Sequence, residues 1–408
     1  MSKAIAVHDQ SDIHRCLATF CLFGRQTVLQ GTKGIPTYIN EFWTSKQRQA
    51  NSLHEIAYRA CFKPQLPRFF IERLTAPGDV VYDPFMGRGT TLLESALLGR
   101  IPYGCDVNPL SDILTRPRLN PPYLAQVQER LAEINLSRCQ HYSQELEVFY
   151  HPETLTAICA LREYLLDREQ QGTIDDVDRW IRMVAVNRLT GHSQGFFSVY
   201  TLPPNQAVSI DSQRKINERL GQTPPRRDVR EIILRKTRAL LRDCGERVCH
   251  MLQTVSPHAR ILTAQAHHTP QIPDGSVHLV VTSPPFLDVV DYAQDNWLRC
   301  WFCGIDPQSV PITIVSSVDE WREAMREVFK ELARVLVRGG WIAFEVGEVR
   351  GGRVRLEEVV LQAVQGLPLV PEAIVINDQR FTKTAHIWGV QNQAKGTNTN
   401  RIVLLRRE

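Results

Sequence analysis

The residues best suited to chemistry stand where predicted strands end. Asp83 closes an apolar run at residues 80–82, and Gly87 and Gly89 follow it in Gly-x-Gly spacing. Glycine allows positive φ angles and lets a ligand approach the backbone closely. A run typical of a helix comes next, at residues 92–98, so we predict the strand, tight loop and helix that begin a nucleotide-binding α/β sheet. A plain turn between strand and helix would need the same glycines, so the flanking residues must decide.

Two acids at strand ends indicate the class of ligand. A carboxylate at Asp83 would repel a pyrophosphate, but it suits a cationic ligand that carries an amino group. S-adenosylmethionine is such a ligand, because it has a sulfonium, an ammonium and no phosphate. A second predicted strand ends in Asp106, where folds of this type place an acid that accepts hydrogen bonds from both ribose hydroxyls. The pair of strand ends therefore predicts S-adenosylmethionine as the cofactor.

A third group, Ser283-Pro284-Pro285-Phe286, follows a predicted buried strand at residues 277–282. Doubly wound sheets place their sites at the carboxyl ends of such strands. Two adjacent prolines fix the backbone and leave neighbouring carbonyls without competing local N–H donors. Ser283 adds a hydroxyl acceptor, and Phe286 offers a planar face to a base.

The elements that must position these groups alternate between strand and helix at both ends of the chain, but not in its middle. Helical periodicity dominates residues 111–255, with apolar residues at i, i+3 and i+4. We predict an N-terminal extension (1–50), the first part of a catalytic domain (51–115), a mainly helical insert (116–255) and the second part of the catalytic domain (256–408). Residues 1–50 have an irregular pattern, which predicts a loop or short surface helix around Phe42 and Trp43. Gly339 and Gly340 predict a turn before a strand at residues 341–346.

A concentrated basic segment lies in the insert. The net charge of the whole chain is only +4, but ten lysines and arginines and three acids stand between residues 214 and 242. Such a segment on an otherwise acidic body fits a polyanion-binding face. The alternatives are a solvated helix surface or a helical lid. The candidate contacts are Arg214, Lys215, Arg226, Arg227, Arg230 and Lys236.

The composition, with 43% hydrophobic and 23% charged residues, is that of a globular protein. No apolar run approaches the ~20 residues of a membrane span, so a cytoplasmic, nucleoid-associated protein without a membrane partner is expected. Ten scattered cysteines do not form a disulfide framework. Cys300 and Cys303 form a CxxC without a second pair, so reduced thiols are favoured over a zinc site and no metal is expected.

The motifs described above resemble those of a known protein family. Residues 83–90, Asp-Pro-Phe-Met-Gly-Arg-Gly-Thr, resemble the S-adenosylmethionine motif of amino-group DNA methyltransferases, and residues 283–286 resemble their catalytic tetrapeptide. Residues 62–64 lie where the family contacts the methionine moiety, and residues 395–401 resemble its final hairpin. The resemblance covers residues 50–120 and 255–408. It implies a Rossmann-like class I methyltransferase sheet with an inserted helical domain, and cofactor contacts from Phe62, Lys63, Asp83, Pro84, Phe85, Gly87, Gly89, Thr90, Asp106 and Asn108.

One position departs from the family pattern. Family members often carry an acid in a Gly-Asp-Ala setting after the strand that begins near residue 261. Here the corresponding sequence is Ala264-Gln265-Ala266. Gln265 is therefore the expected adenine contact, with an amide oxygen in place of a charge.

The resemblance implies methyl transfer to an exocyclic amino group of a flipped base in double-stranded DNA, with a cognate restriction endonuclease acting separately. Ser283 and the Pro284 carbonyl would accept hydrogen bonds from the amine, and Phe286 would stack on the base. Serine in the first tetrapeptide position resembles the cytosine-N4 subgroup, and Asp or Asn the adenine-N6 subgroup. Adenine-N6 transfer is the first alternative. An RNA N-methyltransferase and a DNA-binding protein with a degenerate methyltransferase fold are further ones.

Overall fold

The computed structural model describes residues 10–32, 34–44, 50–58, 61–201, 207–285, 292–311, 317–349, 354–378 and 399–408. Its strands form a nine-stranded sheet in the order β1-β2-β10-β11-β7-β6-β3-β4-β5, and β8 and β9 form a separate small sheet. The bounds are β1 Val28–Thr32, β2 Ile35–Asn40, β3 Val80–Asp83, β4 Ile101–Asp106, β5 Arg260–Thr263, β6 Val277–Thr282, β7 Leu336–Val346, β8 Glu348–Val349, β9 Val354–Arg355, β10 Leu369–Asp378 and β11 Thr399–Arg407.

Five neighbouring strands of the sheet are parallel. Strands β7, β6, β3, β4 and β5 run in one direction, whereas β11 pairs antiparallel with both β7 and β10. The carboxyl ends of β3, β4 and β6 therefore meet at one edge, which is where open α/β sheets place their ligands. The predicted Rossmann-like sheet is confirmed, and so are the predicted strand ends at Asp83 and Asp106.

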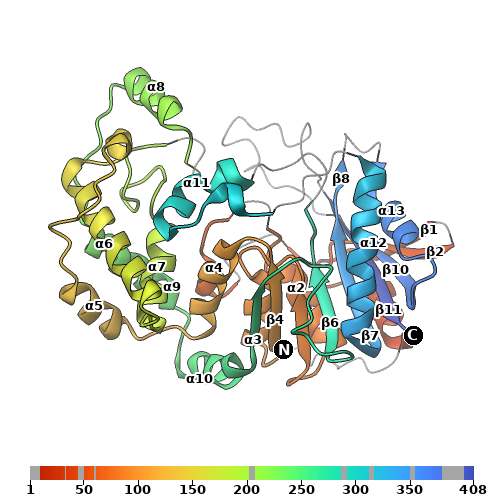
Figure 1. The fold of residues 1–408 in the computed structure, drawn as a ribbon. Coiled ribbons are helices and arrows are strands. Elements are labelled where there is room, and N and C mark those ends of the chain that lie inside the picture. Colours follow the sequence, from red (N-terminus) through yellow and green to blue (C-terminus); the bar gives the residue numbers. More distant parts are fainter. Residues whose placement is uncertain are drawn as a thin grey trace.

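Alternating side chains of the strands supply two cores, one on each face of the sheet. Tyr82 packs with α12 (Val318–Val335) and α13 (Leu356–Ala363) in one core. Val81, its neighbour, packs with α1 (Gln10–Ala18) and α2 (Gln65–Leu74) in the other. This period of two is the ordinary geometry of a strand buried on both faces. Figure 1 shows α12 and α13 lying over the sheet.

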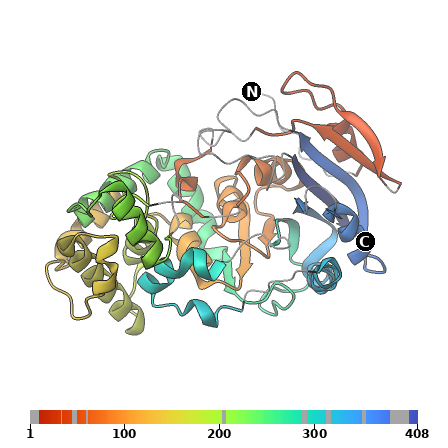
Figure 2. The same ribbon diagram turned by 90° about the horizontal axis from the view of Figure 1, so that it is seen from above.

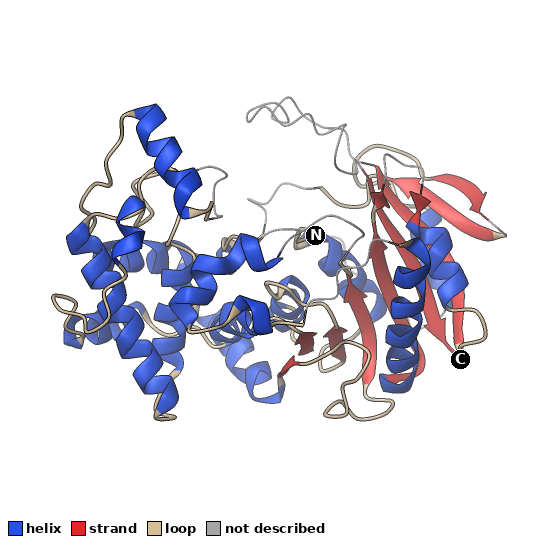
Figure 3. Ribbon diagram, turned by 45° about the horizontal axis from the view of Figure 1, so that its top comes forward, coloured by secondary structure: helices blue, strands red, loops and turns tan. Residues whose placement is uncertain are grey.

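A helical domain fills the chain between β4 and β5 (Figure 1). Figure 3 shows one side of the molecule built of helices alone and the other built of the strands with helices packed against them. The helices that follow β3 and β4 are α3 Thr90–Leu97, α4 Pro109–Leu119, α5 Leu124–Glu133, α6 Pro152–Gln170, α7 Asp176–Val186, α8 Ile210–Leu220, α9 Val229–Leu241 and α10 Glu246–Val255. The predicted helical insert is present, although α4 crosses its expected first residue, 116.

A helix that follows β6 in the chain also joins the core of the helical domain. In α11 (Tyr292–Cys303), Leu298 and Phe302 are buried among side chains of the helical domain. The Trp301 backbone oxygen accepts a 2.8 Å bond from Arg162 on α6. The chain that follows the Ser-Pro-Pro-Phe sequence is therefore attached to the helical domain.

Residues 28–40 form two strands that the sequence did not predict. Strands β1 and β2 extend the main sheet, with β2 parallel to β10. Figure 2 shows this hairpin at the sheet edge, beside the strands from the end of the chain. Phe42 and Trp43 lie in a loop after β2, as one of the two predicted alternatives had it. The other alternative, a surface helix, was wrong: both rings are buried against α2, and their backbone N–H groups donate to the Asn377 side chain at 2.7 and 3.2 Å.

The predicted turn at Gly339 and Gly340 was also wrong, since both residues lie within β7. Gly339 has a φ of 77°. The backbone thus bends at Gly339 without ending the strand, as glycine allows.

Candidate active site

The glycine loop between β3 and α3 has the conformation that its sequence predicts. Gly87 and Gly89 have φ angles of 50° and 69°, in the left-handed region. A Cβ atom on Gly89 would lie 2.3 Å from the Thr115 hydroxyl oxygen, so no larger residue fits without a shift. Gly89 is also the residue that precedes the first turn of α3. Glycine is therefore required at Gly89 both for conformation and for space.

Two buried arginines brace this loop from behind. Arg88 donates a 2.8 Å hydrogen bond to the Ile56 backbone oxygen. Arg118, from α4, donates to the Arg88 backbone oxygen. Burial lowers the pKa of Arg118 to about 9. These contacts tie the loop to residues 51–57 and to α4, which fixes its shape before any ligand arrives.

Asp106 connects the second strand to the glycine loop. Its Oδ2 accepts a 2.8 Å bond from the Gly87 N–H, and its Oδ1 accepts a 2.9 Å bond from the Asn108 N–H. Burial raises the pKa of this carboxyl, while the two backbone bonds oppose the rise. Each carboxylate oxygen has further acceptor capacity, so Asp106 can still take hydroxyl donors from a ligand.

Asp83 lies beneath the loop. Its Oδ1 accepts a 2.6 Å bond from the Thr282 hydroxyl and a 3.1 Å bond from the Phe85 N–H. The side chain is 1% exposed, and burial raises its pKa to about 7. Asp83 thus joins β3 to β6, the strand that leads to Ser283.

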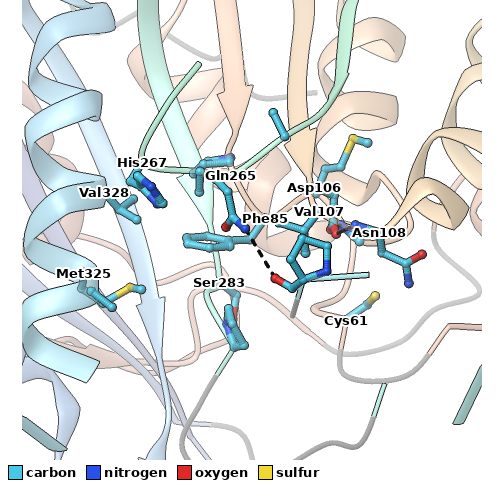
Figure 4. A pocket seen from close by; sticks show the side chains of 18 of the residues that line it. Cys61, Phe85, Asp106, Val107, Asn108, Gln265, His267, Ser283, Met325 and Val328 are labelled. Carbon is cyan, nitrogen blue, oxygen red and sulfur yellow. Dashed lines mark hydrogen bonds between the residues drawn. The ribbon is translucent and has the colours of Figure 1, made fainter. Parts of the chain in front are cut away.

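A cavity of about 370 Å³ opens at this edge of the sheet, a size suited to a small ligand. Figure 4 shows the side chains of Phe85, Asp106, Asn108, Gln265 and Ser283 around it. Gln265 Nε2 lies 3.5 Å from the Pro311 backbone oxygen, the contact drawn in the figure. The cavity brings the predicted cofactor residues and the Ser-Pro-Pro sequence together. The predicted residues that line it are Phe62, Pro84, Phe85, Gly87, Thr90, Asp106, Asn108, Gln265, Ser283 and Pro285.

Other predicted residues stand behind the lining. Asp83, Gly89 and Pro284 are not part of the wall, and neither is Lys63, whose pKa is lowered by burial and by the charge of Arg88. Phe286 lies outside the described residues, as does most of the predicted hairpin at 395–401. The wall therefore accounts for most, but not all, of the predicted cofactor contacts.

The Ser-Pro-Pro backbone is held by α12. The Trp321 indole N–H donates a 3.0 Å bond to the Pro285 backbone oxygen, and Trp321 is almost completely buried. Trp321, Met325 and Val328 line the cavity at i, i+4 and i+7 of α12, where they form an apolar wall. The periodicity of a helix cannot tell a core face from a ligand face, so the sequence did not single out these three residues.

Further cavity residues had weaker sequence signals. Tyr58 and Cys61 precede the predicted methionine segment, and the Tyr58 hydroxyl accepts a 3.4 Å bond from the Asn108 amide. Val107 adjoins the acid at the end of β4, and His267 adjoins the predicted Ala-Gln-Ala sequence. In the sequence, only the proximity of these four residues to a motif indicated a place in the wall of the site.

The basic residues of the helical domain fall into two groups. Arg214 and Lys215 lie exposed on α8, which forms the tip of the domain (Figure 1), and Arg226 is exposed in the loop before α9. Arg214 pairs with Asp211 at 2.7 Å and Arg226 with Glu153 at 2.8 Å. Surface pairs of this kind are weak and exchange readily for a phosphate.

The second group holds the domain together. Arg230 donates to the Leu131 and Ile134 backbone oxygens at 2.8 and 2.6 Å, and Lys236 donates to the Glu55 backbone oxygen at 2.5 Å. Burial lowers the pKa of Lys236 to about 8. Arg227 is half-buried, and its backbone N–H bonds to the Thr154 hydroxyl. The contacts of Arg230 and Lys236 are thus structural ones, which the charge pattern alone did not reveal.

All ten cysteines are free thiols, and Cys300 and Cys303 are buried in α11. Across the part of the chain that the structure describes, histidines, cysteines and acids form no group of three able to hold a metal ion. None of the helices in the described ranges is long and apolar enough to cross a membrane.

The sheet and its ligand edge define a Rossmann-like α/β fold. Residues 24–111 match the sequence model of a family of N6 and N4 methyltransferases described as DNA methylase. That segment runs from before β1 to the start of α4, so it includes the glycine loop and Asp106. The sequence resemblance to amino-group DNA methyltransferases is confirmed there.

Two relatives are type II methyltransferases. The chain is 26% identical over 290 residues to the type II methyltransferase M.BsoBI of Geobacillus stearothermophilus, covering 64% of this chain and 55% of the relative. It is 32% identical over 97 residues to M.MvaI of Kocuria varians, covering 23% of this chain and 20% of the relative. The matched part thus spans about half of one relative and a fifth of the other.

Among solved structures, geranyl diphosphate C-methyltransferase from Streptomyces coelicolor A3(2) aligns with a TM-score of 0.36 and 10% identity, over 98% of this chain and 97% of that one. A likeness at this level does not bear on the reaction.

Proposed function

We propose that this protein is a site-specific DNA methyltransferase that transfers a methyl group from S-adenosylmethionine to the exocyclic N4 of cytosine. The observation that carries the proposal is the single cavity that joins Asp106 and the glycine loop to Ser283 and Pro285. A site that binds a methyl donor and a base must bring these two groups together within the length of one small ligand.

The residues present fit the cofactor. Asp106 would accept the ribose hydroxyls, and Gln265 and Asn108 offer amides beside an apolar wall of Phe85 and Val328 suited to an adenine ring. Phe62, Pro84, Gly87 and Thr90 would line the methionine end, with Lys63, Asp83 and Gly89 behind them. When bound, S-adenosylmethionine supplies an electrophilic methyl group on a sulfonium.

The residues of the chain orient the other reactant. Ser283 and the Pro284 carbonyl accept hydrogen bonds from the target amine, which aims its lone pair, and Phe286 stacks on the base. The base must leave the duplex to reach the bottom of such a cavity. No covalent bond between enzyme and base is required, because the amine nitrogen is itself the nucleophile.

Cytosine N4 is favoured over adenine N6 by Ser283, since serine in this position resembles the N4 subgroup. The adenine-N6 reaction is the second candidate, because the matched family includes both kinds of enzyme.

Double-stranded DNA is the proposed partner, held in part by Arg214, Lys215, Arg226 and Arg227 of the helical domain. A type II restriction–modification system is the proposed setting, in line with the names of the relatives, and its endonuclease would act as a separate protein.

The test is to incubate the protein with labelled S-adenosylmethionine and unmethylated duplex DNA, digest the product to nucleosides and identify the labelled one. N4-methylcytosine is expected. N6-methyladenine would select the second candidate, and label in RNA alone would overturn both. The Ser283→Ala variant should lose turnover while it keeps cofactor binding.

A further inference from the structure

A buried carboxylate stands directly behind the catalytic serine. In the parallel pair β6 and β7, Thr282 is opposite Phe344. Ser283, the first residue after β6, therefore lies beside Glu345, which is still within β7. The Ser283 side chain is close enough to the Glu345 carboxylate to oppose the rise that burial causes in its pKa. Ser283 faces the cavity, whereas Glu345 does not line it. Any effect of Glu345 on a ligand in the cavity must therefore pass through Ser283.

The surroundings of Glu345 keep it in place without neutralising its charge. The Asn400 amide, on β11, donates to Glu345 Oε1. The side chain is 7% exposed, and burial raises its pKa to about 7, with Asp83 on β3 adding a like charge. Among the described residues, the groups that act on Glu345 are thus two neutral side chains, Asn400 and Ser283, and one acid, with no cation to balance it. An unpaired buried carboxylate is costly and needs a reason.

We propose that Glu345 is a positioning residue that acts through Ser283 and takes up the proton released by the target amine. This inference rests on the proposed function. When Glu345 is ionised it accepts the Ser283 O–H, and the serine lone pairs are then turned toward the amine. When Glu345 is protonated it donates to the serine instead, and the hydroxyl hydrogen is turned toward the amine, where it competes for the lone pair.

The proton that the target amine loses is taken up by Ser283 and Glu345. The amine nitrogen forms the new N–C bond as the C–S bond breaks, and sulfur keeps that electron pair. The methylated nitrogen then carries a positive charge and loses an N–H proton to Ser283 Oγ, while the serine hydroxyl proton passes to Glu345. The products are a neutral methylated base, a neutral thioether and a protonated Glu345, which returns its proton to water before the next turnover.

The Glu345→Gln variant tests this assignment. The glutamine oxygen can still accept from Asn400, but its NH₂ group donates to Ser283 and cannot take a proton. We expect kcat to fall about 100-fold or more, as for the loss of other proton acceptors. The Kd for S-adenosylmethionine should change less than twofold. In wild type, kcat should rise with pH through about 7, and this limb should vanish in the variant.

A readout independent of turnover is the infrared band of a protonated carboxyl group. A band that titrates near pH 7 should be present in wild type and reduced in Glu345→Gln. The matched control is Glu357→Gln, which removes another buried carboxylate, one that pairs with Arg401 at 2.8 Å away from the cavity. It should keep both kcat and the pH limb. If Glu345→Gln does not fold, Ser283→Ala serves as the test instead. Its residual kcat should then no longer rise with pH through about 7.

The inference is overturned if wild type methylates DNA and Glu345→Gln keeps its kcat and its pH limb. It is also overturned if Glu345→Gln and Glu357→Gln lose activity equally. A wild-type protein that methylates no nucleic acid would instead refute the proposed function, and an infrared titration assigned to Glu345 would then survive as evidence for the pair.

Discussion

The Trp321 indole N–H donates a 3.0 Å hydrogen bond to the Pro285 backbone oxygen. Proline has no N–H and Pro285 follows another proline, so this segment cannot be held by backbone donors of its own. The tetrapeptide instead takes its position from a side chain on α12, which belongs to the opposite wall of the cavity.

Replacing Trp321 by phenylalanine should loosen the tetrapeptide while keeping an aromatic ring. The loss of one hydrogen bond predicts a fall of about 1 kcal/mol in the free energy of unfolding. We expect a roughly tenfold fall in kcat with little change in the Kd for the cofactor. Trp341→Phe, a largely buried tryptophan in β7, is the matched control. Equal effects of the two variants would argue against a specific role for the indole N–H.

Asp106→Ala should abolish detectable cofactor binding in calorimetry. The variant removes the proposed ribose acceptor and also frees the Gly87 and Asn108 N–H groups that Asp106 holds at 2.8 and 2.9 Å. Asp106→Asn retains one acceptor oxygen and should bind with intermediate affinity. Wild-type affinity in Asp106→Ala would refute the cofactor site.

The Asp83→Asn variant removes the charge of the carboxylate while it keeps the size of the side chain. The asparagine oxygen can keep the bonds from Thr282 and Phe85, so the cavity should be preserved. If the carboxylate acts on the ammonium of the cofactor, affinity for S-adenosylhomocysteine should fall about tenfold or more. Affinity for methylthioadenosine, which has no ammonium, should not change. An equal loss for both ligands would assign Asp83 a purely structural role.

The pH dependence of stability follows from Glu345. Its pKa is raised by burial from 4.5 to about 7, so the folded state keeps the proton that the unfolded chain loses. The stabilisation from the neutral carboxyl is complete below about pH 4 and disappears as the pH rises through 7. Glu345→Gln should therefore gain stability relative to wild type over this window, by up to about 3 kcal/mol. Denaturant unfolding at pH 5 and pH 8 measures the difference, and a constant difference would contradict the raised pKa.

Arg214→Ala combined with Lys215→Ala should weaken DNA binding without affecting the cofactor. Both side chains are exposed on α8. If each contacts a phosphate, the slope of log K against log salt should become shallower by about 2. Lys330→Ala on α12, which removes an exposed lysine paired with Glu327, is the control. An unchanged slope would remove α8 from the DNA face.

Much of the site was predictable, because its groups lie directly after buried strands. Asp83, Asp106 and Ser283 each follow a short apolar run, and parallel strands bring their carboxyl ends to one edge. The glycine conformations followed from spacing in the same way. Sequence therefore predicted the edge of the sheet and the part of the cavity wall that its strand ends supply.

What was missed depends on pairing between distant segments. Glu345 stood in a predicted strand, but its position behind Ser283 is set by the register of β6 against β7. The bond from Trp321 to Pro285 likewise joins residues that are 36 positions apart in the sequence. Arg230 and Lys236 read as free charges, because the carbonyl groups that accept their hydrogen bonds lie far away in sequence.

The pairing of β2 with β10 has a consequence for how the protein is made. Residues 37–40 bond in parallel register with residues 374–377, near opposite ends of the chain. The hairpin formed by β1 and β2 therefore emerges early from the ribosome but has no sheet edge to join until β10 has been synthesised. During that interval its strand edges are exposed, and such edges are prone to pair with other chains. Completion of the sheet is thus a late, long-range step, and we expect it to limit the rate of folding.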